Sequence, residues 1–479
     1  MNYAKMQKKR SIINKEVVSL ARYQLKKKDM PLIEFELNKN KLGDYSVSIV
    51  SMSEAKDNYP EKVYNNDSLL EWLRRRMIPR NRTFVEEILS SQGLQRHDLA
   101  GLLDVCLGLS VNDVYWVTRK EFTGTFREYN LYENSFSEAL SLVAFTGYSD
   151  TIKELSPSPE MTTNGMLPKC WRRIDSSLYL YKGGTNPSEF SNGGNEPYTE
   201  YYAAQVAEAM GIEHVTYNLE KWKNILASTC RNFTSLDYSF VPIGKLLQDS
   251  TLTSLVEVIK KNNAYDSFKD MILLDAVLLN EDRHFGNFGF LKNNETNQYE
   301  KMAPLFDHGI SLLSHLSNKD ILDNSKIEQY IKDHSYSALG RPHDELVSLF
   351  CSRQDIRKLR QLFDFHFKKH DLYNFEDERL QVIESFVQER SRDLIRVIEQ
   401  NKTVNLNDPV QDSIRDELFG YQYEYRGDDE NGGICKIYDS NEGFVEEFEI
   451  SKSDLEQMDA ITFIENKIEV LAEEQTKCR

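Results

Sequence analysis

The chain has 479 residues, of which 40% are hydrophobic and 11% aromatic, and a formal net charge of −17. This length allows two to four globular domains. The negative charge disfavours a nucleic acid as the principal ligand, because its phosphate backbone would be repelled. No apolar run is long enough to span a bilayer, and no apolar segment with a cleavage site follows the basic N-terminus, so we expect neither a membrane span nor a secretory signal.

The six cysteines are scattered and form neither a CxxC pair nor a metal-binding spacing with histidine. This usage indicates reduced thiols in a cytoplasmic protein and argues against a zinc site or a disulfide framework. Charge is uneven along the chain: residues 1–30 carry a balance of +7, and residues 405–479 a balance of −13. Both segments are typical of solvated surfaces, or of surfaces that bind a partner of opposite charge.

Residues 1–152 form an N-terminal region with a basic arm. Periodicity and turn signals predict a helix within residues 1–30, a hairpin over residues 31–52, a helix capped by Ser68 and ended by Pro79, and a second helix over residues 83–91 capped by Asn81. Further helix and aromatic-rich segments follow up to residue 150.

Five arginines cluster around these two helices: Arg74, Arg75, Arg76, Arg80 and Arg82. Two short helices with arginines are compatible with a helix-turn-helix DNA reader. A solvated surface, or pairing with the many acidic residues elsewhere, fits an acidic chain better.

A proline-rich stretch, residues 154–170, separates two composition zones, and we place a domain boundary near residue 152. A turn with Thr162, Thr163, Asn164 and Gly165 then precedes strands at residues 168–173 and 178–182. Such a turn can offer backbone N–H groups to phosphates. Lys182 ends the second strand, where its side chain can reach a phosphate or remain in solvent.

A Gly/Asn-rich loop, residues 183–195, leads to a helix at residues 197–210 with Glu200 in its first turn. Strands are expected at residues 214–219, 225–234 and 239–243. The last strand runs into a proline-containing connector, where backbone groups near Val241 and Ile243 are candidates for contacting an adenine. Beyond residue 246 the chain is mainly helical. Helices are predicted at residues 252–260, 266–279, 323–331, 344–350, 353–367 and 375–400.

The most informative stretch is residues 274–313, which interrupts these helices. A polar loop with Asp282 and Asn287 follows the helix that ends at residue 279. A hairpin of residues 288–291 and 301–305 comes next, and Asp307 directly after it. One carboxylate, Asp282, can accept the proton of an attacking hydroxyl. An amide oxygen and a second carboxylate, from Asn287 and Asp307, can hold magnesium against nucleotide phosphates.

The C-terminal segment, residues 412–479, follows a polar linker at residues 401–411. Strands at residues 418–426, 433–438 and 444–450 and a helix at residues 455–474 predict a small acidic α+β module.

Three motifs together resemble the HipA-like serine/threonine kinases, bacterial toxin kinases distantly related to protein and phosphatidylinositol kinases. Residues 282–287 (DRHFGN) match the catalytic-loop pattern Asp-x-His-x-x-Asn. Residues 303–307 (APLFD) are similar to the metal-binding Ala-Pro-x-Tyr-Asp segment, with Phe306 in place of tyrosine. Residues 162–169 (TTNGMLPK) are similar to the phosphate-loop pattern Ser-x-x-Gly-x-Gln-x-Lys, with Leu167 in place of glutamine.

The resemblance implies an α+β, bilobal kinase-like core with a small β-rich N-lobe (residues 153–245) and a helical C-lobe (residues 246–402), between accessory N- and C-terminal modules. It implies ATP and Mg²⁺ as cofactors. Its residue roles are as follows: Asp282 is the general base, Asn287 and Asp307 bind magnesium, Lys182 contacts phosphates, Glu200 pairs with Lys182, and Arg283 and His284 shape the loop.

Family members phosphorylate a serine of their own phosphate loop, which shuts the enzyme off. Thr162 stands at that position here, with Thr163 beside it, so both are candidate autophosphorylation sites. The implied partners are a protein substrate carrying serine or threonine and an antitoxin or other regulatory protein. Direct DNA binding is disfavoured by the charge.

The motifs leave three alternatives to a protein kinase. The catalytic-loop motif is also similar to that of phosphatidylinositol kinases, so a lipid kinase is the first alternative. A nucleotide-binding regulator or interaction protein without catalysis is the second. The third, a DNA-binding regulator acting through residues 1–100, fits the charge least.

Overall fold

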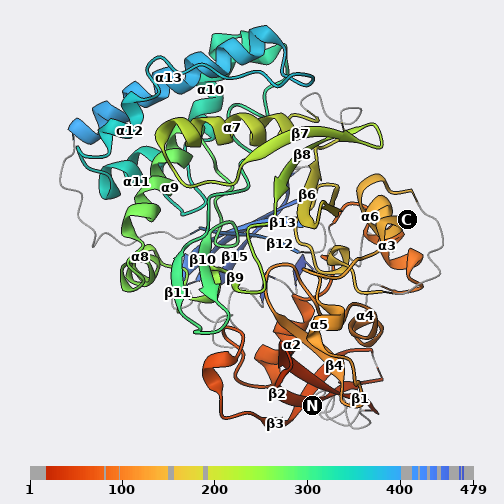
Figure 1. Cartoon of the computed structure of the whole chain (residues 1–479). Helices are drawn as coiled ribbons and strands as arrows, with labels where there is room; N and C mark the ends of the chain where they lie inside the picture. The colour runs from red at the N-terminus through yellow and green to blue at the C-terminus, as the bar shows by residue number, and fades with distance from the viewer. Residues whose placement is uncertain are drawn as a thin grey trace, which may run out of the picture.

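The computed structural model describes residues 18–41, 43–79, 82–95, 98–148, 156–186, 193–400, 413–418, 421–428, 432–439, 444–451, 463–464 and 467–468. Over these residues the chain has a mixed α+β fold of small antiparallel sheets and helices, as predicted. Figure 1 shows the N-terminal strands at the bottom, further sheets in the middle and most of the later helices at the top.

The N-terminal region is built on a four-stranded antiparallel sheet in the order β3-β2-β1-β4. Its strands are β1 (Val18–Lys27), β2 (Met30–Lys39), β3 (Tyr45–Met52) and β4 (Tyr115–Arg119), and its helices are η1 (Lys56–Asn58), α2 (Asn66–Arg74), α3 (Val85–Ser91), α4 (Leu99–Cys106), α5 (Phe126–Tyr129) and α6 (Glu138–Thr146). Pairing of β2 with β3 confirms the predicted hairpin.

Two local predictions in this region are wrong, and a third falls partly outside the described residues. The helix expected within residues 1–30 is wrong from Val18 onward, because β1 pairs with both β2 and β4 and buries alternate side chains such as Tyr23 and Leu25. The N-cap of α2 is Asn65, which forms a capping box with Ser68, so Ser68 is not the cap itself. α3 begins after Phe84, whose backbone is left-handed (φ 64°), and the predicted cap Asn81 lies outside the described residues.

A second antiparallel sheet, ordered β5-β6-β8-β7, follows. Its strands are β5 (Lys169–Ile174), β6 (Ser177–Gly183), β7 (Tyr217–Trp222) and β8 (Ile225–Arg231); η2 (Pro159–Met161) precedes it and α7 (Glu196–Met210) packs on it. α7 ends at Gly211, whose positive φ of 67° suits glycine. Glu200 lies beyond the first turn of α7, because the helix begins at Glu196.

β9 (Tyr238–Pro242) does not join that sheet. It pairs with β10 (Gly289–Asn293), which pairs in turn with β11 (Tyr299–Met302). The strand expected to close the N-lobe is therefore hydrogen-bonded to a hairpin beyond the boundary that we placed at residue 245. Gly289 permits this pairing, since a Cβ there would lie 2.1 Å from the Val241 carbonyl oxygen.

The largest hydrophobic core lies in the helical part and receives side chains from α7 as well. Its helices are η3 (Ile243–Lys245), α8 (Leu252–Lys261), α9 (Tyr265–Leu278), η4 (Asp320–Leu322), α10 (Asn324–Asp333), α11 (His343–Phe350), α12 (Ile356–Arg360) and α13 (Asp377–Glu399). The long helix predicted over residues 353–367 is wrong, because only α12 is α-helical there. α9 is the central member and is buried along most of its length.

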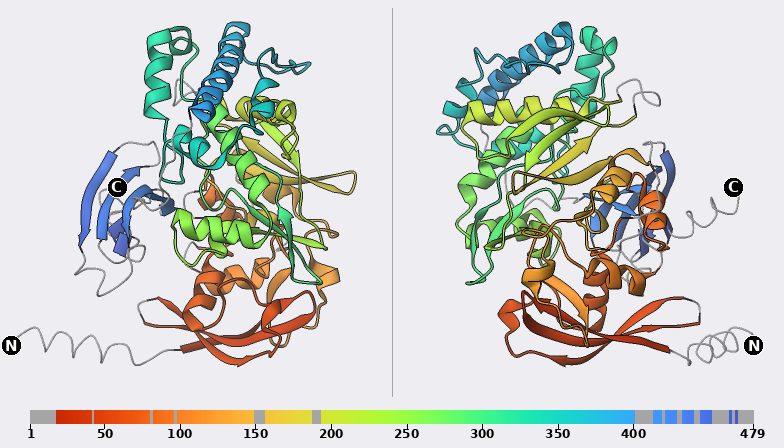
Figure 2. Two further views of the ribbon diagram at one scale, coloured as in Figure 1. Left: turned by 90° about the vertical axis from the view of Figure 1, so that its left-hand side faces the viewer. Right: turned by 45° about the vertical axis from the view of Figure 1, so that its right-hand side comes forward.

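The C-terminal segment contains a four-stranded antiparallel meander in the order β12-β13-β14-β15. Its strands are β12 (Ser413–Leu418), β13 (Tyr421–Asp428), β14 (Gly432–Asp439) and β15 (Phe444–Ser451). Three of these were predicted, and β12 was not. In the side view of Figure 2 this sheet stands beside the middle of the molecule. The linker at residues 401–411 and most of the predicted final helix lie outside the described residues.

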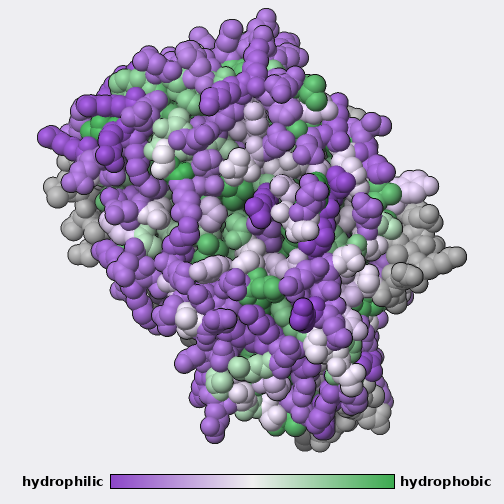
Figure 3. All heavy atoms as spheres, in the orientation of Figure 1, coloured by the Kyte–Doolittle hydropathy of each residue, from purple (hydrophilic) through white to green (hydrophobic). Residues whose placement is uncertain are grey.

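The face shown in Figure 3 is mainly hydrophilic, with hydrophobic residues in small groups between polar ones. No helix in the described part of the chain combines the length and the apolar character needed to cross a membrane.

Candidate active site

The site is built around Lys182 on β6. Its ammonium lies 2.8 Å from Glu200 Oε1 and also contacts the Asp307 carboxylate. Burial opposes a charge on Lys182, but the two carboxylates outweigh it and raise its pKa. Glu200 is fully buried and accepts a second hydrogen bond, at 2.9 Å, from the backbone N–H of His308. A sheet strand, a packed helix and the segment after the hairpin thus meet at one ammonium group.

Asp307 is held in an unusual backbone conformation. Its φ is +60°, a left-handed value that aspartate tolerates better than most residues. Its N–H donates to the Tyr217 hydroxyl at 3.2 Å. The strand before it ends at Met302, so Asp307 does not follow the hairpin directly, as predicted, but comes after a short connector. Burial raises the pKa of Asp307, but the ammonium groups of Lys182 and Lys169 outweigh it, so the pKa is lowered.

Asp282 lies in the loop after α9 and is half-buried. Burial raises the pKa of Asp282 to about 6, and the negative charge of Asp307 contributes in the same direction. A carboxylate with such a pKa is a better proton acceptor at neutral pH than an ordinary aspartate. Asn287 donates from its amide nitrogen to the Asp282 carbonyl at 2.8 Å, which leaves its amide oxygen as the atom that can bind a cation.

Arg283 holds the Asp282–Asn287 loop in place through buried hydrogen bonds. It is fully buried and bonds the Asp275 carboxylate on α9 through Nε and Nη2, each at 3.0 Å. It also donates to the carbonyls of Asn287 and Phe306. One guanidinium therefore connects the central helix, the Asp282–Asn287 loop and the segment carrying Asp307. His284 acts more locally, since its Nδ1 accepts a 3.0 Å hydrogen bond from Gly286 N–H.

The predicted phosphate-loop segment lies at the head of β5. Asn164 and Gly165 are exposed, and Gly165 has a φ of +93°. A Cβ at Gly165 would lie 2.1 Å from the ammonium nitrogen of Lys169, so this lysine reaches the loop. Burial, and next the nearby Lys182, lower the pKa of Lys169 to about 7. A bound phosphate would favour its charged form.

The two threonines of this segment are turned into the protein. Thr162 donates to the Leu109 carbonyl at 2.8 Å and Thr163 to the Pro159 carbonyl at 2.6 Å. Thr163 also accepts a 2.9 Å hydrogen bond from the Trp171 indole. In this conformation both hydroxyls are occupied, that of Thr162 by the N-terminal region and that of Thr163 within the segment.

Arg82 fastens the same segment to the N-terminal region. Its guanidinium bonds the Glu160 carboxylate at 2.7 Å, and both side chains are fully buried. It also donates to the carbonyls of Glu160, Thr163 and Lys169. Within the predicted arginine cluster, Arg75 pairs with Glu71 and Arg76 with Asp113, so the expected pairing with acidic residues is confirmed for these arginines. Arg80 lies outside the described residues.

The connector predicted to bind adenine is already hydrogen-bonded. Ile243 is fully buried, and its N–H donates to the Phe288 carbonyl at 2.9 Å. Val241 is buried and lies opposite Phe290 in the β9–β10 ladder. The Gly244 carbonyl accepts a 3.1 Å hydrogen bond from Lys62. The Ile243 N–H, one of the backbone groups that we considered for an adenine contact, is therefore occupied by the hairpin.

Four residues of the site were not assigned to it from the sequence: Asp275, Tyr217, His308 and Arg82, the last of which was noted only as part of an arginine cluster. Asp275 left a signal, because an aspartate inside the apolar run MILLDAVLL needs a buried partner. The other three act through contacts between segments far apart in the chain, which no local pattern shows.

Comparison with known proteins gives one clear sequence match. A stretch of 159 residues is 28% identical to the serine/threonine-protein kinase CtkA of Helicobacter pylori and covers 29% of this chain. Over this stretch the chain is similar to a serine/threonine-protein kinase. The match spans about half (48%) of the length of CtkA. No family model matches the chain.

Two solved structures superpose in part on this chain. The crystal structure of the H. pylori kinase CtkA superposes with a TM-score of 0.37 at 21% identity, covering 49% of this chain and 95% of that one. The HipA toxin of Shewanella oneidensis, solved with HipB and operator DNA, gives a TM-score of 0.44 at 10% identity, covering 80% of this chain and 100% of that one. Both superpositions are loose, so the kinase relationship rests on the sequence match.

Proposed function

We propose that this protein is an ATP- and Mg²⁺-dependent protein serine/threonine kinase. The observation that carries the proposal is the Lys182 ammonium, which contacts both Glu200 and Asp307, with Asp282 and Asn287 on the adjoining loop. A lysine–glutamate pair beside a metal-binding aspartate is the arrangement that protein kinases use to hold ATP phosphates. The relationship to a serine/threonine kinase supports the same reaction class.

The donor set fits a magnesium–nucleotide complex. Carboxylate and amide oxygens are the ligands that Mg²⁺ prefers, and Asp307 and Asn287 supply one of each. Magnesium, when bound, would neutralise charge on the transferred phosphoryl group. Lys182 would then contact phosphate oxygens, with Glu200 keeping it oriented. Gly165 and Lys169 would line the phosphate side of the site.

Asp282 has the role of proton acceptor in this proposal. The hydroxyl of the acceptor side chain gives its proton to the Asp282 carboxylate, and its oxygen attacks the γ-phosphorus of ATP as ADP leaves. The raised pKa of Asp282 suits this task, because it makes the carboxylate more basic while leaving most of it ionised at pH 7. Arg283 keeps the loop in place by its bonds to Asp275.

The proposal includes control by autophosphorylation at Thr162 or Thr163. Both hydroxyls donate to backbone carbonyls, those of Leu109 and Pro159, so phosphoryl transfer to either requires the segment to detach from these contacts. A phosphate adds a charge of about −1.5 to −2, which would prevent the threonine from returning to its buried position and would repel ATP phosphates. The loop would then remain displaced and the kinase inactive.

The decisive experiment incubates the purified chain with labelled ATP and Mg²⁺, offering protein and phosphoinositide acceptors side by side. We expect label on protein, and a loss of about 10²–10⁴-fold in rate for Asp282→Asn. Asp364→Asn, a change in another acidic residue of the helical part, serves as the control. Equal transfer by Asp282→Asn would refute the assignment of the base, and label on lipid alone would replace the protein-kinase proposal with the lipid-kinase alternative.

Mass spectrometry of the same reaction locates any autophosphorylation. Phosphate on Thr162 or Thr163, absent from Asp282→Asn, would support the regulatory part. Nucleotide binding without any transfer would instead favour the noncatalytic regulator.

A further inference from the structure

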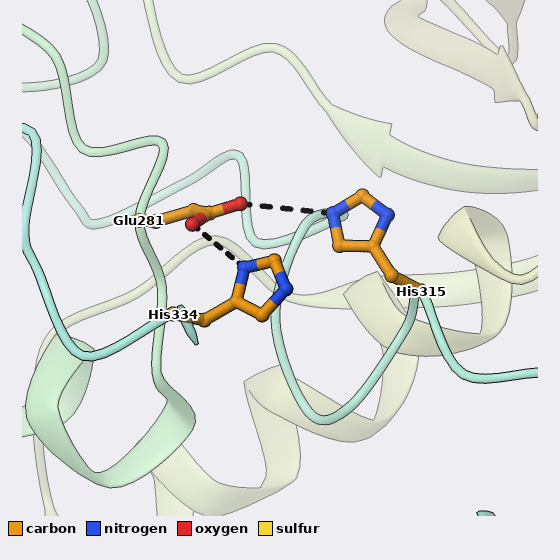
Figure 4. Close-up of side chains that lie close together, drawn as sticks. All are labelled: Glu281, His315 and His334. Atoms are coloured by element: carbon orange, nitrogen blue, oxygen red, sulfur yellow. Dashed lines mark hydrogen bonds and ion pairs between the residues drawn. The ribbon is translucent and has the colours of Figure 1, made fainter. Parts of the chain in front are cut away.

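Glu281, His315 and His334 form a cluster (Figure 4) that includes the residue directly before Asp282. Its members come from three segments: the residue just before Asp282, the loop that follows Asp307, and the C-terminal cap of α10. Each offers one ligand atom, and these atoms all lie within 4.8 Å of one another. Over the described ranges this is the one group of three or more His, Cys, Asp or Glu side chains with that property.

The two histidines direct ring nitrogens at the same carboxylate. Glu281 Oε2 lies 2.8 Å from His334 Nδ1, and Oε1 lies 3.7 Å from His315 Nε2. Figure 4 shows the carboxylate beside the two rings, with one oxygen directed at each. All three side chains are partly buried, with exposed fractions of 19–25%. The site is thus sheltered but open to an ion from solvent.

Stacking holds the imidazoles in this orientation. The His315 and His334 rings stack with centroids 5.3 Å apart, and Tyr330 stacks on His334 at 4.0 Å. Aromatic packing of this kind restricts ring rotation. The ligand atoms are therefore oriented before any ion arrives.

The donor set fits a zinc-class ion better than magnesium. Imidazole nitrogen suits zinc and its transition-metal neighbours, whereas magnesium demands oxygen ligands. In a tetrahedral zinc site with bonds of about 2.0–2.1 Å, neighbouring donors lie roughly 3.3 Å apart. The two Glu281–histidine distances, 2.8 Å to Oε2 and 3.7 Å to Oε1, lie on either side of that value. Three protein ligands with an open fourth position form a common zinc arrangement.

We propose that Glu281, His315 and His334 bind one zinc-class divalent ion, at a site separate from the magnesium ligands Asn287 and Asp307. The bound ion would join the loop carrying Asp282 to the segment after Asp307 and to α10. From the sequence alone we expected no zinc site, because the chain has neither a cysteine pair nor a short metal-binding spacing. These ligands are instead 34 and 19 positions apart and meet only in the fold.

The test titrates the full-length chain, stripped with a chelator, with Co²⁺ in the presence of excess Mg²⁺, and then displaces the cobalt with Zn²⁺. We expect one equivalent of cobalt with the intense visible bands of a four-coordinate site. Glu281→Gln, His315→Asn and His334→Asn should each weaken binding by more than the roughly 10–100-fold that loss of an outer-shell partner costs.

His366→Asn is the matched control, because His366 also contacts a carboxylate, that of Glu384, at 2.7 Å. It should bind cobalt as the parent chain does. So should Asp307→Asn, which separates this site from the magnesium site and from the outcome of the kinase assay. Circular dichroism and the melting temperature without metal check that each variant folds, and Zn²⁺ should raise the melting temperature of the parent chain but not of Glu281→Gln.

Two results would overturn the proposal. One is the absence of stoichiometric cobalt or zinc binding by the folded parent chain. The other is binding of equal affinity by folded Glu281→Gln and His334→Asn variants. In either case the cluster is a carboxylate–histidine hydrogen-bond group that holds the loop without an ion.

Discussion

Replacing Arg82 by methionine should destabilise the chain far more than replacing a surface arginine. Methionine keeps the length of the side chain but removes its charge and its donors. The Glu160 carboxylate, which has no exposed side-chain surface, then loses its cation. Three backbone carbonyls, those of Glu160, Thr163 and Lys169, lose a hydrogen bond at 2.7, 3.1 and 2.7 Å.

The expected cost is about 3–5 kcal/mol, the range observed when one partner of a buried ion pair is removed. Burial raises the pKa of Glu160 even with Arg82 present. Without the guanidinium this carboxyl should take up a proton, which limits the loss. Its remaining bonds, from Trp171 N–H at 2.7 Å and the Ser141 hydroxyl at 3.4 Å, also stay. The double variant Arg82→Met/Glu160→Gln should therefore recover much of the stability, since no unpaired buried charge is left.

Urea unfolding measures the loss, and hydrogen exchange of residues 156–169 shows whether it is local, because a chain with several cores need not unfold in one step. Arg75→Met is the control: Arg75 and Glu71 form an i,i+4 pair in which both side chains are 58% exposed. Such a pair contributes about 0.3–0.5 kcal/mol. The reasoning fails if Arg82→Met costs no more than about 1 kcal/mol beyond Arg75→Met, or if exchange in residues 156–169 is unchanged.

Three further changes test other parts of the structure. Lys182→Met should lower the rate of phosphoryl transfer by about 10²–10³-fold, as loss of one group that stabilises transition-state charge does, and unchanged single-turnover rates would contradict its role. Gly165→Ala should weaken ATP binding in a titration, because its Cβ would lie 2.1 Å from Lys169 Nζ and its φ is +93°, whereas equal affinity would show that the loop is not used. Burial lowers the pKa of His343 to about 3, so the unfolded chain binds a proton below about pH 6.5 and the folded chain does not. The free energy of unfolding should consequently fall with decreasing pH, by about 2 kcal/mol at pH 5. His343→Leu should remove that pH dependence, whereas the exposed-residue control His366→Leu should keep it.

The sequence was most informative where chemistry is local. Asp282 and Asn287 lie on the predicted loop after α9, and Asp307 lies beyond the predicted β10–β11 hairpin, although a short connector separates them. The strands around Lys182 and the helix carrying Glu200 were also predicted, because periodicity and glycine stops are local signals. The same reasoning failed for β1, where helical spacing of apolar residues was overridden by pairing with two neighbouring strands.

By itself, then, the sequence determined the element types along most of the chain and supplied the candidate site residues. Only the tertiary structure decided which of them meet. It brought Lys182, Glu200 and Asp307 into contact across 125 positions, buried Arg82 against Glu160, paired β9 with a hairpin beyond the expected boundary, and assembled Glu281, His315 and His334. The physical reason is that local pattern reports on backbone preference and on which face is apolar. Pairing between distant charged groups depends instead on packing and on the desolvation that packing imposes.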